Sequence, residues 1–232
     1  MQADAVLHDA LIDRQVLELA HRARRIDVGK RGHRPSTAQR FINKSLVDAA
    51  RTYQCVVRLK GGDPSVFGRL DEEMEALREA GIAFEIIPGI TAASAAAAEL
   101  QVSLTLRGVA RSVSFLTPCV CDEHDDATWQ PASDLLKSGA SLAIYMGGRQ
   151  IPTIARRLMT AADAETPIVV VENVSGDRSE WVGTLADAAD APPELGSGPV
   201  ILLIGKAMQG HLDRHREATK QLARAGVARQ VA

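Results

Sequence analysis

The sequence predicts an α/β protein built as two lobes, the first with a mainly parallel sheet and the second with a mixed sheet. Two observations favour this fold class. Strand-like and helix-like segments alternate through the first hundred residues, as they do in parallel sheets with crossover helices. From Ser112 onward strand candidates dominate, and "SEWVGTL" alternates as an antiparallel strand does.

In the first lobe, helices and strands are expected in turn. Ser36 and Gln39 have the spacing of a capping box, which predicts a helix that carries Phe41, Ile42, Leu46 and Val47. The segment 70–80 places acids in its first turn and Gly81 just past its end, as helices prefer. Two further helices are expected at 13–23 and 91–100, the latter rich in small residues, and strands at 4–8, 24–30, 55–59 and 83–87.

The second lobe is predicted to contain five strands and one clear helix. The helix, at 151–161, has Pro152 near its first turn. An acidic loop is expected at 121–130. The boundary between the lobes is placed within 106–111, which makes the lobes residues 1–110 and 111–209. A polar, basic tail at 210–232 is expected to form a solvated helix. The strands are expected at 112–117, 141–146, 166–172, 179–185 and 199–205.

The composition is that of an ordinary globular protein, with 46% hydrophobic residues in a chain of 232 residues. A formal net charge of −2 gives no reason to expect binding to nucleic acid or to an anionic membrane. Three cysteines, an odd number, suit a reducing compartment better than a disulfide framework. No apolar run is long enough to span a bilayer, and the first residues lack the pattern of a signal peptide. We therefore expect a soluble cytoplasmic protein.

The segment "VVRLKGGDPSVFGR", residues 56–69, contains the most informative turn. Ligands of α/β sheets bind outside the carboxyl ends of the parallel strands, and this turn follows such a strand. Gly61 and Gly62 remove side-chain bulk, so that backbone amides can approach a ligand, and Asp63 places a carboxylate beside them. A tight turn with a solvated acid is the alternative that Gly61, Gly62, Asp63 and Pro64 alone leave open.

The wider sequence resembles the tetrapyrrole methylase family, and within it the uroporphyrinogen-III C-methyltransferases. The resemblance is carried by "VVRLKGGDPSVFGRLDEE", "GIAFEIIPGITAASAAAAEL" and "LTLRGVARSVSFLT". Shorter stretches in the same order, "VGKRG", "YMG", "VVVEN" and "GPVILLIGK", extend it over about residues 3–208.

This resemblance implies a fold of two α/β lobes with S-adenosylmethionine bound in the cleft between them. It also implies methylation of two pyrrole carbons of uroporphyrinogen III to give precorrin-2, the precursor of sirohaem and cobalamin, by a homodimer. Two alternatives stay open. One is a sister methylase that acts on a later corrinoid precursor, and the other is an inactive homologue with a binding role.

Family positions that contact the cofactor correspond here to seven residues. Thr91 opens the small-residue helix, where a hydroxyl and free amides suit the carboxylate of a methionine moiety. An ordinary helix cap is the alternative for Thr91, and a core methionine is the alternative for Met146. The resemblance implies Gly61, Gly62, Asp63, Thr91, Ala92, Met146 and Val174 as cofactor-binding residues.

Asp9 and Lys30 match the acid–base pair of the family. When a pyrrole carbon attacks the methyl group, the ring becomes cationic and must lose a proton, so a carboxylate near that carbon is useful, and a lysine can neutralise or protonate where charge develops. The substrate has eight carboxylates, and cations should therefore surround the site. The candidates are Lys30, Arg31, His33, Arg34, Arg58, Lys60, Arg69, Arg107 and Arg111.

Cys119, Cys121 and His124 are suitable metal ligands by type, but three ligands in one loop without a fourth make a poor zinc site, and no metal is expected. The chain also departs from the family pattern. It begins after the usual first strand and its G-x-G-P-G-D loop, a loss expected to expose a sheet edge. The other departures are Thr117-Pro118-Cys119 for T-G-H, Leu106 for the histidine of L-T-H-R, Ser65 for an aromatic residue, Val174 for a glycine and Pro35 for a histidine.

Overall fold

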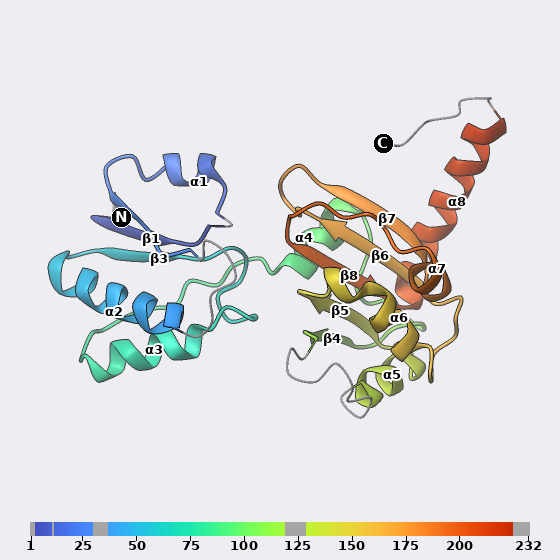
Figure 1. Ribbon diagram of the computed structural model, residues 1–232, viewed down its shortest axis with the longest axis horizontal. Coiled ribbons are helices and arrows are strands. Elements are labelled where there is room, and N and C mark those ends of the chain that lie inside the picture. The colour runs from blue at the N-terminus through green and yellow to red at the C-terminus, as the bar shows by residue number, and fades with distance from the viewer. Residues whose placement is uncertain (1–2, 11, 30–36, 119–128, 225–232) are drawn as a thin grey trace. The chain divides into compact units, whose positions relative to one another are not determined.

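The computed structural model describes residues 3–10, 12–29, 37–118 and 129–224. The chain divides into two compact units, and the boundary between them in the sequence lies between Thr91 and Ala92. Figure 1 shows the helices and strands of both units.

The first unit contains a fully parallel three-stranded sheet, as the sequence predicts. Its strands are β1 (Ala5–His8), β2 (Arg24–Asp27) and β3 (Val56–Leu59), in the order β2-β1-β3. Because all three run in one direction, their carboxyl ends meet at one edge of the sheet, where His8 pairs with Asp27 on one side and with Leu59 on the other.

Two helices pack together and against this sheet. They are α2 (Thr37–Thr52) and α3 (Leu70–Glu79), and their apolar faces supply Ile42, Leu46 and Leu77 to a core that also contains Leu7 and Val28. The predicted features of the second helix are confirmed, since its first turn is acidic and Gly81 takes a left-handed φ of 67° just beyond its end.

The predicted helix at 13–23 is much shorter in the structure. Helix α1 covers only Arg14–Glu18 and has no buried residue. Val16 is 45% exposed and Leu19 is 81% exposed, so these apolar residues, which predict a longer helix, are not covered by the described part of the chain. Most of the stability of a short helix comes from such packing, which explains why the helix ends early.

The predicted strand at 83–87 is wrong. Residues 83–90 form no regular element, and every one of them is exposed. A strand needs a neighbour to satisfy its backbone groups, and among the described residues none pairs with this segment. Strand β3 likewise pairs only with β1 and leaves its other edge open in the described part of the chain.

The second unit contains a mixed five-stranded sheet, again as predicted. Its order is β4-β5-β8-β6-β7. β7 is antiparallel to β6, and β8 is antiparallel to both β5 and β6, so β4, β5 and β6 point the same way. The strands are β4 (Val113–Leu116), β5 (Ser141–Tyr145), β6 (Pro167–Glu172), β7 (Ser179–Thr184) and β8 (Val200–Ile204).

Helices cover both faces of the mixed sheet, which explains why its central strands are apolar on both sides. Ile168 and Val170 point to one face, and Val169 and Val171 point to the other. Helices α5 (Gln130–Lys137), α6 (Ile151–Leu158) and α7 (Leu185–Asp190) pack on the first face, and α4 (Ala92–Glu99) and the start of α8 (Gln209–Arg224) pack on the second. Short 3₁₀ turns lie at Gly148–Gln150 and Lys206–Met208.

Helix α4 approaches the sheet closely, as its small residues predict. Ala93 and Ala96 are fully buried against β8 and its neighbours. This helix belongs to the second compact unit although it precedes residue 110. The lobes as predicted, residues 1–110 and 111–209 with a tail at 210–232, are a different division of the chain and stay a prediction.

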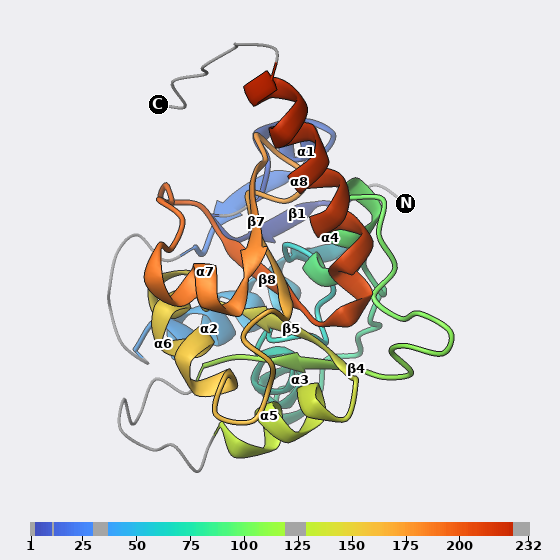
Figure 2. The ribbon, with the colours of Figure 1, turned by 90° about the vertical axis from the view of Figure 1, so that its right-hand side faces the viewer.

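Helix α8 contacts the sheet only through its first turn. Leu212 is 2% exposed, whereas residues 213–223 are all exposed, and the helix extends away from the sheet (Figure 2). Beyond its first turn, the described part of this helix is thus exposed as far as residue 223. Within the described ranges, no helix combines the length and the apolar character that crossing a bilayer requires.

A buried carboxylate fastens the loop that leads into β8. Glu172, at the end of β6, is 5% exposed and accepts hydrogen bonds from the amides of Gly196 (2.9 Å) and Gly198 (2.7 Å). These two bonds, the one from Gly196 first, lower the pKa of Glu172 below its ordinary value.

We expect Glu172→Gln to lower the free energy of unfolding at pH 7 by about 1–3 kcal/mol, because an amide side chain cannot accept both bonds. Since the pKa is lowered in the folded state, the stabilisation is complete above the unfolded pKa of about 4.5 and disappears as the pH falls through the lowered value. Urea unfolding at pH 7 and pH 3.5 measures this. Glu194→Gln, an exposed carboxylate nearby, is the control, and equal effects of the two variants would contradict the prediction.

Candidate functional site

The turn between β3 and α3 is held in shape by Asp63. One carboxylate oxygen accepts a hydrogen bond from the amide of Ser65 (2.8 Å), and the other accepts one from the amide of Gly89 (3.0 Å). These bonds, the one from Gly89 first, lower the pKa of Asp63. Asp63 therefore ties the turn to the unpaired segment 83–90.

Three glycines near this turn are required by the fold itself. Gly62 has a left-handed φ of 85°. A Cβ atom on Gly89 would lie 2.5 Å from the carbonyl oxygen of Gly62, and one on Gly68 would lie 2.4 Å from that of Pro64. Side chains at these two positions would force the turn apart.

Gly61 differs from them, because neither its backbone nor its packing demands a glycine. Its φ is not left-handed, and the nearest atom to an added Cβ would be Cδ1 of Ile12, at 3.9 Å. Among the described residues, the space beside Gly61 is therefore open. Glycine without a structural reason at the carboxyl end of a parallel strand is typical of close approach between backbone and ligand.

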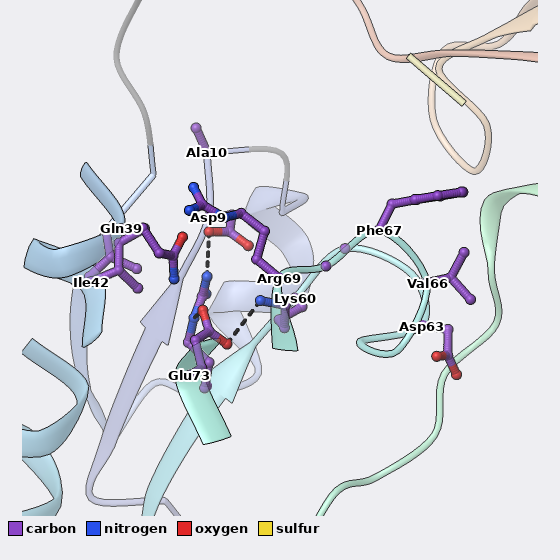
Figure 3. Close-up of a pocket in the computed structure, with 14 residues that line it drawn as sticks. Asp9, Ala10, Gln39, Ile42, Lys60, Asp63, Val66, Phe67, Arg69 and Glu73 are labelled. Atoms are coloured by element: carbon purple, nitrogen blue, oxygen red, sulfur yellow. Dashed lines mark hydrogen bonds and ion pairs between the residues drawn. The ribbon is translucent and has the colours of Figure 1, made fainter. Parts of the chain in front are cut away.

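A cavity of about 450 Å³ opens beside this turn (Figure 3). It is built at the carboxyl end of the parallel sheet, where β1 is followed by Asp9 and β3 by Lys60 and Gly61. Ala10, Val28 and Ile42 add apolar surface. The structure thus brings together Asp9, Gly61 and Asp63, three of the residues that the sequence predicts for catalysis or cofactor binding.

The charged groups of the cavity are paired with one another. Arg58 donates to Asp9 through Nη2 (2.6 Å) and to Glu73 through Nε (3.0 Å), and Lys60 donates to the other oxygen of Glu73 (2.9 Å). Figure 3 shows the side chains of Glu73 and Lys60 pointing toward each other. Only 10% of the Arg58 side chain and 8% of that of Lys60 are exposed. Both cations neutralise carboxylates of the protein, which does not fit the predicted contact with substrate.

Arg69 also lines the cavity, and its own conformation is unusual. It makes two hydrogen bonds to Glu72, at 2.7 and 2.8 Å, which raise the pKa of its guanidinium. Its φ of 53° is left-handed, as is that of Phe67 at 52°. Such conformations are costly for residues with side chains and cluster at functional sites.

In the second unit, the predicted cofactor residues gather at one edge of the mixed sheet. β5 and β6 point the same way, so Met146 after β5 and Val174 after β6 lie at the same edge. Ala92 and Val174 pack against the same core cluster. The hydroxyl of Tyr145 accepts a hydrogen bond from the amide of Ala93 (3.2 Å), which joins the first turn of α4 to the end of β5.

Backbone strain marks this edge as well. Met146 has a φ of 58° and is 65% exposed, which excludes the alternative that it is a core methionine. Asn173 and Ser175, on either side of Val174, have left-handed φ values of 56° and 66°. Among the described residues only one other non-glycine residue outside these two regions, Gln101, has such a φ.

Several predicted residues cannot be placed. Lys30, Arg31, His33 and Arg34 lie outside the described residues, as do Cys119, Cys121 and His124. Within the part of the chain that is described, no group of three or more metal-ligating side chains is found. Thr91 is described, and it directly precedes α4.

Glu73 is a site residue that the sequence did not single out. It lies one helical turn before Leu77, on the face of α3 that is buried. The i, i+4 spacing with a core leucine is the signal that could have identified it, because acids on the buried face of a helix are rare unless they are paired. Tyr145 was also not among the predicted site residues, because a tyrosine at the end of a strand is ordinary.

The chain is similar to known proteins in sequence and in structure. A family model for tetrapyrrole (corrin/porphyrin) methylases matches residues 1–189. The chain is 41% identical over 217 residues to siroheme synthase 1 of Klebsiella pneumoniae, and the match covers 90% of this chain and 44% of that protein. Siroheme synthase of Pseudomonas fluorescens is also 41% identical, with 90% and 45% covered. The chain thus spans less than half the length of these relatives.

Among solved structures, the chain is similar to uroporphyrin-III C-methyl transferase from Thermus thermophilus in complex with S-adenosylhomocysteine. The sequence identity is 30%, the TM-score is 0.75, and the match covers 90% of this chain and 88% of that one. The predicted resemblance and the predicted fold class are confirmed by these matches.

We expect Gly89→Ala to lower the free energy of unfolding by about 1–3 kcal/mol, because its Cβ would collide with the carbonyl of Gly62. Gly61→Ala should change it by less than about 0.5 kcal/mol, because its Cβ meets open space. Chemical unfolding of both variants measures the contrast. Equal destabilisation by the two substitutions would show that Gly61 has a structural role.

Proposed function

Because the chain belongs to the tetrapyrrole methylase family, we propose that it methylates two pyrrole carbons of uroporphyrinogen III to give precorrin-2. By its family the chain is a methyltransferase, and the methyl donor is S-adenosylmethionine. The observation that carries the proposal is the open backbone at Gly61, which lines the same cavity as the carboxylate of Asp9.

The surroundings of Gly61 are suited to binding the methyl donor. The cavity has room beside the backbone, and Asp63 fixes the turn through Ser65 and Gly89 without needing a ligand. When bound, S-adenosylmethionine supplies an electrophilic methyl group on a sulfonium sulfur. Gly61 and Gly62 would hold it with peptide groups, and Thr91, Ala92, Met146 and Val174 are the proposed contacts from the rest of the chain.

Asp9 is the proposed proton acceptor. A new carbon–carbon bond to the methyl group leaves the pyrrole ring positively charged, and loss of a proton from the ring nitrogen or a neighbouring bridge carbon returns it to neutrality. The Asp9 side chain is 30% exposed and lines the cavity. Its Oδ1 is bound to Arg58, and no partner of its Oδ2 is found among the described residues, so that oxygen can take the proton. Lys30 keeps its proposed role as the partner acid.

The carboxylates of the substrate need cations other than Arg58 and Lys60, which are buried in ion pairs. Arg107 and Arg111 are exposed and stay candidates. We further propose that precorrin-2 is used for sirohaem or cobalamin, and that the protein is a cytoplasmic homodimer. The relatives named siroheme synthase support the use for sirohaem.

We expect Gly61→Val to abolish binding of S-adenosylhomocysteine, because the added side chain would fill the space beside the backbone. Isothermal titration calorimetry of the folded variant measures this. Gly210→Ala, in α8, is the control, since its Cβ would meet nothing closer than 3.6 Å. Wild-type affinity in Gly61→Val would place the donor elsewhere.

We expect the chain to transfer methyl groups to uroporphyrinogen III, and Asp9→Asn to slow the reaction by about 10²-fold or more. Mass spectrometry of the products, with Asp71→Asn as the control, tests both statements. Activity only on later corrinoid precursors would favour the sister methylase. Binding of the donor without methylation of any of these substrates would favour the inactive homologue.

A further inference from the structure

The guanidinium of Arg58 is fixed on every side by the first unit. Nε donates to Glu73 (3.0 Å), and Nη2 donates to Asp9 (2.6 Å). Nη1 donates to the carbonyl of Leu59 (2.9 Å) and makes a longer contact to that of Leu7 (3.5 Å). Because the group is planar and its donors point in fixed directions, the orientation of Nε determines the position of Nη2.

Glu73 is the residue that sets this orientation. It is 2% exposed, and its two oxygens accept from different cations, Oε1 from Arg58 and Oε2 from Lys60. Lys60 therefore prevents the carboxylate of Glu73 from turning away from Arg58. The four groups carry two positive and two negative charges, so that the cluster is neutral as a whole.

We propose that Glu73 is a positioning residue for methyl transfer, which holds Arg58 and through it the carboxylate of Asp9 at the rim of the cavity. This inference rests on the proposed role of Asp9 as proton acceptor. Glu73 itself does not touch the reacting atoms, since Arg58 lies between it and Asp9. A misplacement of about 1 Å in a reacting group can cost a factor of roughly 10² in rate.

A purely structural role would be the neutralisation of two buried cations. Glu73→Asp separates the two roles, because it keeps the negative charge but shortens the side chain by one methylene group. If charge alone matters, aspartate restores the behaviour of the wild type. If position matters, aspartate fails to restore it, because its carboxylate cannot reach Arg58 and Lys60 with the same geometry. Glu75→Asp, on the exposed part of α3, is the matched control.

The first readout needs no activity. In protein labelled with ¹³C at aspartate carboxyl groups, with the signal of Asp9 assigned by its loss in Asp9→Asn, we expect Glu73→Asp to shift the Asp9 signal. Glu75→Asp should leave it unchanged. Glu73→Gln, which removes the charge, should shift it as well. An Asp9 signal at its wild-type position in folded Glu73→Asp would overturn the proposal.

The second readout is kinetic. We expect Glu73→Asp to lower kcat for methyl transfer by about tenfold or more, with the affinity for S-adenosylhomocysteine unchanged, because the donor is bound at Gly61 and not at Asp9. An unchanged kcat, or equal losses of donor affinity and rate, would overturn the inference. An inactive wild type would instead refute the proposed function, and the Asp9 signal would still decide whether Glu73 positions this carboxylate.

Discussion

The carboxylate of Asp63 makes the interaction on which the site depends. Segment 83–90 lies in no sheet and is exposed throughout, so that strand pairing does not position it. Asp63 accepts a hydrogen bond from the amide of Gly89 with one oxygen and from that of Ser65 with the other. A side chain on Gly89 would collide with the carbonyl of Gly62, and Gly62 itself has a left-handed φ. With these contacts in place, the turn after β3 keeps its shape and leaves the backbone of Gly61 open. A hydrogen bond from an amide to a charged oxygen is well suited to this task, because it is stronger than one between neutral groups.

A second constraint lies deeper in the same unit. Arg58 and Lys60 are buried beside the cavity, and they are tolerated there because Asp9 and Glu73 neutralise them. The cavity is therefore lined by charged groups that face one another. Asp9, whose side chain is 30% exposed, and Gly61 follow the adjacent ends of β1 and β3, and both line this cavity.

The fold could be predicted from the sequence wherever a segment's own pattern decides its structure. The central strands β6 and β8 of the mixed sheet are apolar runs, and α3 has acids at its start and glycine after its end, so these elements were predicted. The segment 83–87 has the composition of a strand, yet it forms none, because pairing depends on a neighbour and not on the segment. Helix α1 ends early for the related reason that its apolar residues are not covered by the described part of the chain.

The sequence by itself determined the family, the α/β class and the position of the glycine-rich turn after β3. It could do so because glycines at a given spacing reflect the local conformation of the backbone. Only the tertiary structure decided which glycines the fold itself requires, since Gly61 and Gly89 look alike until the atoms around them are known. It also showed that Arg58 and Lys60 are paired within the protein and that Glu73 belongs to the site. Such pairings join β1, β3 and α3, which lie far apart in the chain, and ion pairs between distant residues leave no periodic signal in a sequence.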